Sequence, residues 1–238
     1  VILRLVTRLS HARAGVLPRS GRAQNPLEKA ADRTRWMLLP ALARKNYRAL
    51  IDRQGDFLSW ANAHPANKLE LEGADTSFAV LTTGLGGNYY EENLADLTTQ
   101  NGGKAPARLH IGAYPIPEDS IKTLCEKAKK LLIIEEGQPV VEDAIRTILP
   151  GTVAIYGKLD ETLPRDGELD PDKVRKALGL PPLASIGISA PELPGRPPQL
   201  CQGCPHFDSY SVIKEAISGL ESVAVTSDIG CYALGAQP

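Results

Sequence analysis

Three of the four cysteines lie within about the last forty residues, and each sits in a tight turn rich in glycine or proline. Cys201 and Cys204 form a Cys-x-x-Cys pair that runs on to His206, and Cys231 follows later. Thiolates at this spacing suit zinc or an iron–sulfur cluster, which usually take four ligands. Only three cysteines converge here, with His206 as a possible fourth ligand, so the metal site is predicted to be either incomplete in this chain or not a cluster. The structural alternative is reduced thiols in tight turns.

One supersecondary unit is expected to bring the two cysteine turns together. Residues 222–226 have the composition of a buried strand, and a helix precedes them. A helix followed by a strand that joins a parallel sheet returns the chain towards its start. Asp228, Gly230 and Cys231 would then lie beyond the carboxyl end of the strand, the edge at which open α/β sheets bind ligands. The apolar positions that predict the helix are Tyr210, Ile213, Ala216, Ile217 and Leu220.

The two turns, Leu-Cys-x-Gly-Cys-Pro-His and Asp-Ile-Gly-Cys-Tyr-x-Leu-Gly, resemble the α subunits of indolepyruvate:ferredoxin oxidoreductases. Those enzymes belong to the thiamine-diphosphate-dependent 2-oxoacid:ferredoxin oxidoreductase family. The resemblance implies that the turns open the domain that binds the diphosphate of the cofactor. The residues that it places beside the cofactor are Cys204, His206, Asp228, Gly230 and Cys231. The resemblance also implies three candidate cluster ligands, which are Cys201, Cys204 and Cys231.

The first seventeen residues resemble the end of the pyrimidine-binding domain of the same family. Residues 1–7 are expected to form a strand, and Thr7, Arg8, Ser10 and His11 match the Arg-x-Thr-Thr-Arg-x-Ser-His segment of the family. That segment lies near the active site in the family, so the resemblance makes Arg8 and His11 candidate cofactor-binding residues. The sequence alone also fits a solvated, capped turn.

Residues 72–160 carry the clearest domain pattern. Expected strands at 77–82, 108–114, 131–134 and 152–156 alternate with expected helices at 89–99, 117–129 and 139–149. Near-continuous apolar strands that alternate with helices predict an α/β fold, with a parallel sheet covered on both faces. The segment 132–137 resembles the transketolase-C-terminal-like domain of the family. That domain is largely architectural, and in some relatives it contributes to CoA binding.

Three features of this domain have a chemical and a structural interpretation. The glycine turn at 84–87 could present backbone N–H groups to phosphate, but Tyr89 replaces the third glycine of the dinucleotide fingerprint, which favours a plain turn. Glu135 and Glu136 end a buried strand, where capping or pairing is favoured over acid–base chemistry. Cys125 falls on an apolar helix face and is expected to be inert core.

The remaining segments are predicted to be connectors and partial domains. Residues 18–71 form a basic helical linker, with helical patterning over 27–58 and a new helix from Pro40. The connector at 161–195 holds a short helix with Asp170 as N-cap, Pro171 at its first position and Gly179 after its end. Residues 181–198 are a proline-rich tether. Residues 1–17 and 196–238 are the end and the start of two thiamine-diphosphate-binding-type α/β domains, so we expect an internal piece of a longer polypeptide.

The composition is ordinary for a globular protein, with 42% hydrophobic and 23% charged residues and a net charge of −1. This charge gives no case for nucleic acid as a partner. No apolar run approaches the roughly 18–20 residues that span a bilayer, so we expect no membrane contact. Four cysteines do not resemble a secreted disulfide framework, which favours a reducing cytoplasm.

The family resemblance implies an oxidoreductase that decarboxylates aryl-2-oxoacids such as indolepyruvate to aryl-acetyl-CoA, with ferredoxin as electron acceptor and a β subunit as partner. It implies thiamine diphosphate, Mg²⁺ and a 4Fe–4S cluster in the parent enzyme. The glutamate that activates the cofactor and the Gly-Asp-Ser-type metal motif would lie outside these residues. We therefore name no catalytic residue and expect the chain alone to bind no thiamine diphosphate tightly and to have no turnover. Two alternatives are a non-enzymatic scaffold and a Cys3His zinc module built from Cys201, Cys204, His206 and Cys231.

Overall fold

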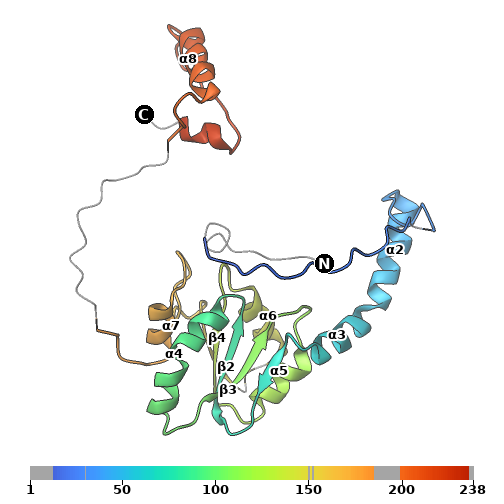
Figure 1. Ribbon diagram of the computed structural model, residues 1–238, viewed down its shortest axis with the longest axis vertical. Helices are drawn as coiled ribbons and strands as arrows, with labels where there is room; N and C mark the ends of the chain where they lie inside the picture. Colours follow the sequence, from blue (N-terminus) through green and yellow to red (C-terminus); the bar gives the residue numbers. More distant parts are fainter. Residues whose placement is uncertain (1–12, 30, 150, 152, 185–198, 236–238) are drawn as a thin grey trace. The chain divides into compact units, whose positions relative to one another are not determined.

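The computed structural model describes residues 13–29, 31–149, 151, 153–184 and 199–235. The strand expected at residues 1–7, the candidates Arg8 and His11, and most of the proline-rich tether lie outside the described residues. The chain divides into two units, Val1–Leu183 and Ala184–Pro238, and each is described here by itself (Figure 1).

The first unit is built on a five-stranded sheet with the order β1-β3-β2-β4-β5. The strands are β1 (Lys68–Glu70), β2 (Asp75–Thr83), β3 (Pro106–Ile111), β4 (Lys130–Ile134) and β5 (Ala154–Tyr156). The pairs β2–β3, β2–β4 and β4–β5 are parallel, which confirms the predicted α/β class with its parallel sheet. β1 pairs antiparallel with β3 and was not predicted.

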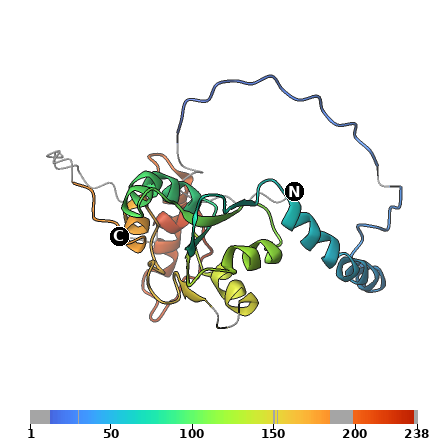
Figure 2. The ribbon, with the colours of Figure 1, turned by 90° about the horizontal axis from the view of Figure 1, so that it is seen from below.

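Helices cover both faces of this sheet (Figures 1 and 2). Successive side chains of a strand point to opposite faces, so Val80 and Leu81 of β2 enter different cores. Val80 packs in the core beside α4 (Gly86–Gln100) and α7 (Pro171–Ala177). Leu81 packs in the core beside α5 (Glu118–Cys125) and α6 (Val140–Ile148). Burial on two faces explains why the strands are apolar along their length.

Two predicted elements stop three or more residues before their expected ends. β3 stops at Ile111 and not at Tyr114, because the N–H groups of Gly112 and Ala113 each donate to Asn67 Oδ1 at 2.9 Å instead of to a strand. The expected helix at 117–129 ends at Cys125, and the backbone then returns to the sheet, where the Lys129 N–H donates to the Ser77 carbonyl.

The linker before the sheet contains two helices, α2 (Pro40–Asp52) and α3 (Gln54–Ala63). Pro40 starts α2 as predicted, and Leu39 before it is extended, as expected for a residue that precedes proline. No helix precedes Pro40 within residues 31–39, so the helical patterning over 27–39 was misleading. α3 is tied to α5, because Asn62 Nδ2 donates to Asp119 Oδ2 at 2.9 Å.

Asn67 joins the end of α3 to the loop after β3. Its amide nitrogen donates to the carbonyls of Ala61 and Ala113 at 2.8 and 3.0 Å. Its amide oxygen accepts the two N–H groups of Gly112 and Ala113. One side chain therefore holds two stretches of backbone that are far apart in the sequence.

The second unit contains α8 (Pro205–Ile217) and a short 3-10 helix, η1 (Cys231–Gly235). The buried strand predicted at 222–226 is wrong, since these residues have no strand structure and Val223 and Val225 are 44% and 53% exposed. A strand needs a neighbour for its backbone hydrogen bonds, and residues 199–235 contain none. In the described part of the whole chain, no helix combines the length and apolar character needed to cross a membrane.

Candidate functional site

The first cysteine turn lies at the start of α8. The Cys204 N–H donates to the Cys201 carbonyl at 3.0 Å, and Gly203 has a φ of +74°, which favours glycine. Cys204 is the N-cap of α8, with extended backbone, and Pro205 is the first helical residue. The turn is thus fixed by the Gly-Cys-Pro order that made it conspicuous in the sequence.

The second turn folds back onto α8. The Tyr232 ring stacks on His206, with 5.7 Å between ring centroids. The Tyr210 hydroxyl donates to the Tyr232 carbonyl at 2.5 Å. A Cβ on Gly235 would lie 2.5 Å from the Tyr210 ring, so glycine is needed for this approach. The two turns do meet, as predicted, but through aromatic contacts with α8 and not through a strand.

The reactive groups of these turns are only partly gathered. Cys204 Sγ lies 3.2 Å from His206 Nδ1, while Cys201 and Cys231 are exposed free thiols. Within the described residues, no group of three or more His, Cys, Asp or Glu side chains is arranged to hold a metal ion. As placed, this unit offers a thiol–imidazole pair and not the four ligands that a cluster or a structural zinc takes.

The other two predicted residues of the second turn have local roles. Asp228 Oδ1 accepts the N–H of Ile229 at 2.6 Å, so the carboxylate shapes its own turn. A Cβ on Gly230 would lie 2.6 Å from the Tyr232 ring, so this glycine lets the ring pack close to the backbone.

The sheet of the first unit has a topological switch point at the carboxyl ends of β2 and β4. These neighbouring strands lead into α4 and α6, which pack on opposite faces. Crevices at such points are the usual ligand sites of open α/β sheets. The loops that meet there are the glycine turn at 84–87 and residues 135–138.

The glycine turn is used for close packing. Gly84 has a φ of +55°. A Cβ on Gly86 would lie 2.5 Å from the Ile134 carbonyl oxygen, and one on Gly87 would lie 2.9 Å from the His110 ring. Close packing therefore explains why glycines occupy these positions, without a bound phosphate. This agrees with the plain turn that the sequence favours.

Glu135 caps α6 from the end of β4. Its carboxylate is buried and accepts the N–H groups of Val141 and Glu142 at 3.0 and 2.9 Å. Burial raises the pKa of Glu135, and the two donated hydrogen bonds oppose that shift. The capping role predicted for this residue pair is therefore observed for Glu135.

A buried pair beside it was not predicted. Glu142 is fully buried, and its carboxylate accepts the backbone N–H of Lys158 at 2.7 Å and the Arg146 guanidinium at 2.7 Å. Lys158 is 1% exposed and donates from Nζ to the Gly137 carbonyl at 2.6 Å. Burial lowers the pKa of Lys158. In the sequence, the glycine at position 157 is the one hint of this close packing, because a Cβ there would lie 2.4 Å from Glu142 Oε2.

A second polar cluster surrounds β3. Arg108 is buried, forms an ion pair with Glu91, and lies over the Tyr90 ring at 4.7 Å. His110 Nδ1 lies 2.9 Å from Thr82 Oγ1. Burial, together with the nearby Arg108 charge, lowers the pKa of His110. This cluster fixes α4 on the sheet and places the His110 imidazole near the carboxyl edge.

Comparison with known proteins gives similarity along the whole chain. No protein-family profile matches it. The chain is 33% identical over 251 residues to indolepyruvate oxidoreductase subunit IorA from Methanothermobacter thermautotrophicus, covering 100% of this chain and 40% of that protein. The chain is a relative of IorA. This confirms the resemblance drawn from the two cysteine turns.

Other IorA proteins give the same picture. The protein from Archaeoglobus fulgidus is 33% identical over 253 residues, covering 99% of this chain and 38% of its own length. The protein from Thermococcus kodakarensis is 32% identical over 260 residues, with 100% and 39% covered. The chain therefore spans about 40% of the length of these IorA relatives.

One solved structure is also similar, a 2-oxoglutarate:ferredoxin oxidoreductase from Magnetococcus marinus with 2-oxoglutarate, coenzyme A and succinyl-CoA bound. It matches with a TM-score of 0.42 and 16% identity, over 59% of this chain and 24% of that one.

Proposed function

We propose that the chain is part of a 2-oxoacid:ferredoxin oxidoreductase subunit. Its reaction is the oxidative decarboxylation of indolepyruvate and related aryl-2-oxoacids to aryl-acetyl-CoA and CO2, with ferredoxin as the electron acceptor. The observation that carries the proposal is the similarity to IorA over the whole chain. Its partners would be a β subunit and ferredoxin, in a reducing cytoplasm where the free thiols persist.

The two units would divide the work. The α/β body of the first unit would serve as a rigid scaffold, because its polar groups are already engaged in capping and pairing. The cysteine turns would border the cofactor, with the thiol–imidazole pair of Cys204 and His206 on the cofactor side. The further residues proposed for cofactor binding are Arg8, His11, Asp228, Gly230 and Cys231.

Thiamine diphosphate with Mg²⁺, when bound, would supply the carbon nucleophile and the electron sink for decarboxylation. The protein would position the 2-oxoacid and exclude water. A 4Fe–4S cluster held by Cys201, Cys204 and Cys231 would need a fourth ligand and a closer approach of the thiols than the described arrangement has. Because these residues include neither the activating glutamate nor the Gly-Asp-Ser-type metal motif that the resemblance implies for the parent enzyme, the isolated chain is expected to bind no thiamine diphosphate tightly and to have no turnover.

The test is an assay of the complete polypeptide that contains this chain, co-purified with its β subunit. We expect CoA-dependent reduction of ferredoxin with indolepyruvate, and slower reduction with pyruvate or 2-oxoglutarate. Replacing Cys204 by Ala should remove most of the activity, while the matched change Cys125→Ala, in the core of the body, should retain it. A complete enzyme that ignores indolepyruvate but uses 2-oxoglutarate would overturn the substrate assignment.

A scaffold without catalysis is the second candidate, favoured by the self-contained core of the first unit. Metal analysis of the anaerobically purified chain separates the alternatives. A brown, oxygen-sensitive protein supports a cluster, and a colourless protein with one equivalent of zinc supports the Cys3His module. A metal-free protein whose complete form shows no ferredoxin reduction supports the scaffold.

A further inference from the structure

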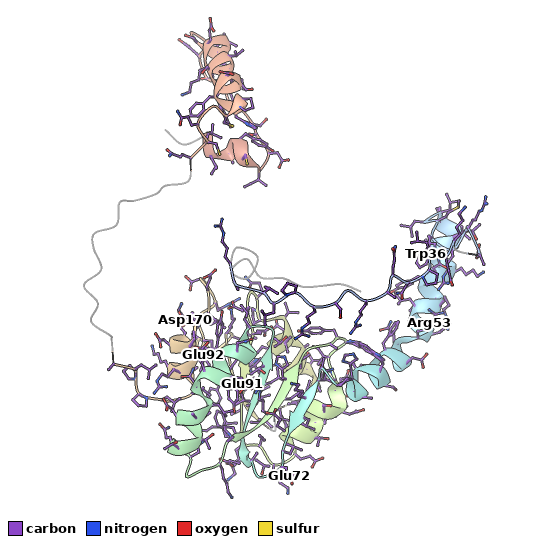
Figure 3. All side chains as sticks on the ribbon, in the orientation of Figure 1. Trp36, Arg53, Glu72, Glu91, Glu92 and Asp170 are labelled. Carbon is purple, nitrogen blue, oxygen red and sulfur yellow. The ribbon has the colours of Figure 1, made fainter. Side chains whose placement is uncertain are left out.

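A surface cavity of about 670 Å³ lies within the first unit, at the edge of the sheet where the parallel strands begin. The walls of the cavity come from the first residues of β2 and β4, from β5 and from the carboxyl ends of α4 and α7. Figure 3 labels Glu72, in the turn before β2, near this edge, and Asp170 at the opposite end of α7. Ligand pockets of proteins span roughly 300–1,000 Å³, so the cavity is large enough for an organic ligand.

The floor of the cavity is apolar and partly aromatic. Phe78 of β2 pairs in register with Lys130 of β4, and Leu132 of β4 pairs with Tyr156 of β5. Because positions 130 and 132 lie on the same side of β4, all four residues share the face of the sheet that α4 and α7 cover. Leu178, directly after α7, packs in the same core and also lines the cavity. Aromatic and aliphatic surface of this kind suits a planar ring.

Two cations line the cavity without a partner. Lys129 and Lys130 are both exposed, and neither ammonium group forms an ion pair or a hydrogen bond with any residue that the structure describes. Asp75 is the one acidic residue among the lining residues, so they carry a net positive charge. Lysine ammonium groups are common ligands of phosphate. The charge of the cavity therefore favours an anionic group beside the apolar floor.

The carboxylate of Asp75 is partly engaged. Its Oδ1 accepts the N–H and the hydroxyl of Ser77 at 2.9 and 2.7 Å. These hydrogen bonds, together with the nearby Lys104 charge, lower the pKa of Asp75, so the carboxylate is ionised at neutral pH. Its Oδ2 accepts no hydrogen bond from a residue within the described ranges. A carboxylate with a free oxygen is the usual acceptor for the hydroxyls of a ribose.

The carboxyl ends of α4 and α7 bring further acceptors to the cavity. Gln100 Nε2 donates to the Gly179 carbonyl at 3.4 Å and so joins the two helix ends. Ala177 and Leu178 line the cavity, and their carbonyls accept no hydrogen bond from the described part of the chain, as is usual in the last turn of a helix. Asn101, the C-cap of α4, adds an amide group. Such groups can pair with the N–H groups on the edge of a nucleotide base.

We propose that this cavity binds a purine nucleotide, with its phosphates at Lys129 and Lys130, its ribose at Asp75 and its base on the apolar floor. An inorganic anion would leave the floor uncovered, and an uncharged ring would leave the two lysines without a partner. A nucleotide satisfies both. The cavity lies at the sheet edge opposite the switch point, and none of its lining residues belongs to the second unit. The site therefore suits an effector, and the inference does not rest on the proposed function.

The experiment is calorimetric titration of the full chain with ADP. We expect saturable binding of one ADP per chain, which weakens as salt rises because the ion pairs are screened. Lys129→Glu with Lys130→Glu should raise the dissociation constant by about tenfold or more. The matched control is Lys122→Glu with Lys127→Glu, which makes the same change in charge at two exposed lysines outside the cavity. This control should change the dissociation constant by less than about twofold.

Hydrogen exchange of backbone amides, measured by mass spectrometry, locates the bound nucleotide. We expect ADP to slow exchange over residues 75–78 and 177–180, and to leave residues 84–87 and 201–206 unchanged. Ala177→Trp, which fills the cavity without changing charge, should abolish binding.

Circular dichroism would establish that each variant is folded. A chain that binds no ADP at millimolar concentration would overturn the proposal. So would equal affinity for tripolyphosphate, since the site would then take the anion alone, and so would tighter binding of coenzyme A than of ADP. Protection from exchange that is confined to residues 84–87 or to the cysteine turns would place the nucleotide elsewhere and also overturn it.

Discussion

The α/β body of the first unit buries its apolar residues, whereas the second unit, called here the cysteine unit because it carries Cys201, Cys204 and Cys231, leaves most of its apolar residues exposed. In the body, strand residues such as Leu81 and Ile133 are fully buried, and even the charged Glu142 and Lys158 are enclosed with partners. In the cysteine unit, α8 has no buried residue, and Val225 remains 53% exposed although it lies in the segment 222–226 that has the pattern of a strand. The difference shows that an apolar pattern predicts burial only where the chain also supplies the opposing surface.

The largest expected effect is on the buried carboxylate of the body. Glu142→Ala removes the acceptor for Arg146 and for the Lys158 N–H, and should lower the free energy of unfolding by about 3–5 kcal/mol. Denaturant unfolding followed by circular dichroism measures it. The matched change Asp143→Ala, on the same helix, should cost little because residue 143 is exposed. Equal losses in both variants would contradict the assignment.

The next largest effect is the loss of stability on truncating an apolar side chain, which should differ between the two units. Leu81→Ala leaves a cavity between β2 and the helices and should cost about 2–5 kcal/mol. Val225→Ala, in the cysteine unit, should stay within about 0.5 kcal/mol. The same unfolding experiment compares the two variants. If Val225→Ala proved as costly as Leu81→Ala, the predicted strand at 222–226 would be buried after all.

The cysteines of the two units should differ in how fast their thiols react with an alkylating reagent. Burial raises the pKa of Cys125 to about 11, against an ordinary value of 9.0. Its thiolate fraction near neutral pH is then roughly a hundredfold lower than that of an unperturbed thiol, and its burial blocks reagents as well. Iodoacetamide and peptide mass mapping should show Cys201 and Cys231 modified long before Cys125. Alkylation of Cys125 at a comparable rate in the folded chain would place it outside the core.

The smallest effect concerns a helix cap. Asp170 accepts the Lys173 N–H at 2.8 Å at the start of α7, so Asp170→Ala should cost about 1 kcal/mol. Asp170→Asn keeps the acceptor and should recover most of the loss. A thermal melt of both variants makes the comparison. If the asparagine variant were as unstable as the alanine variant, the charge and not the cap would be responsible.

The sequence predicted those parts of the fold that depend on local pattern. The strands β2 and β4, the start of α2 at Pro40 and the cap of α7 at Asp170 all follow from neighbouring residues. Long-range contacts were the weakness. The antiparallel β1 and the early end of β3 depend on Asn67, whose four hydrogen bonds no periodicity reveals.

The candidate site was predicted in the same partial way. The turn of Cys201 and Cys204 was evident, because its Gly-Cys-Pro order dictates the backbone locally. The stacking of Tyr232 on His206 was not, because it depends on how α8 and η1 happen to pack. The burial of Lys158 was missed for a related reason: a lysine in a turn normally points into water, and only the Gly137 carbonyl and the nearby glutamates retain it.

The fourfold bonding of Asn67 has a mechanical consequence. Because one amide grips both the end of α3 and the backbone at Gly112 and Ala113, these two segments must shift as one piece. A displacement of α3 would therefore be carried to the backbone that follows β3. The next contact along this path is the hydrogen bond between the hydroxyls of Tyr114 and Thr83, which lies at the carboxyl end of β2.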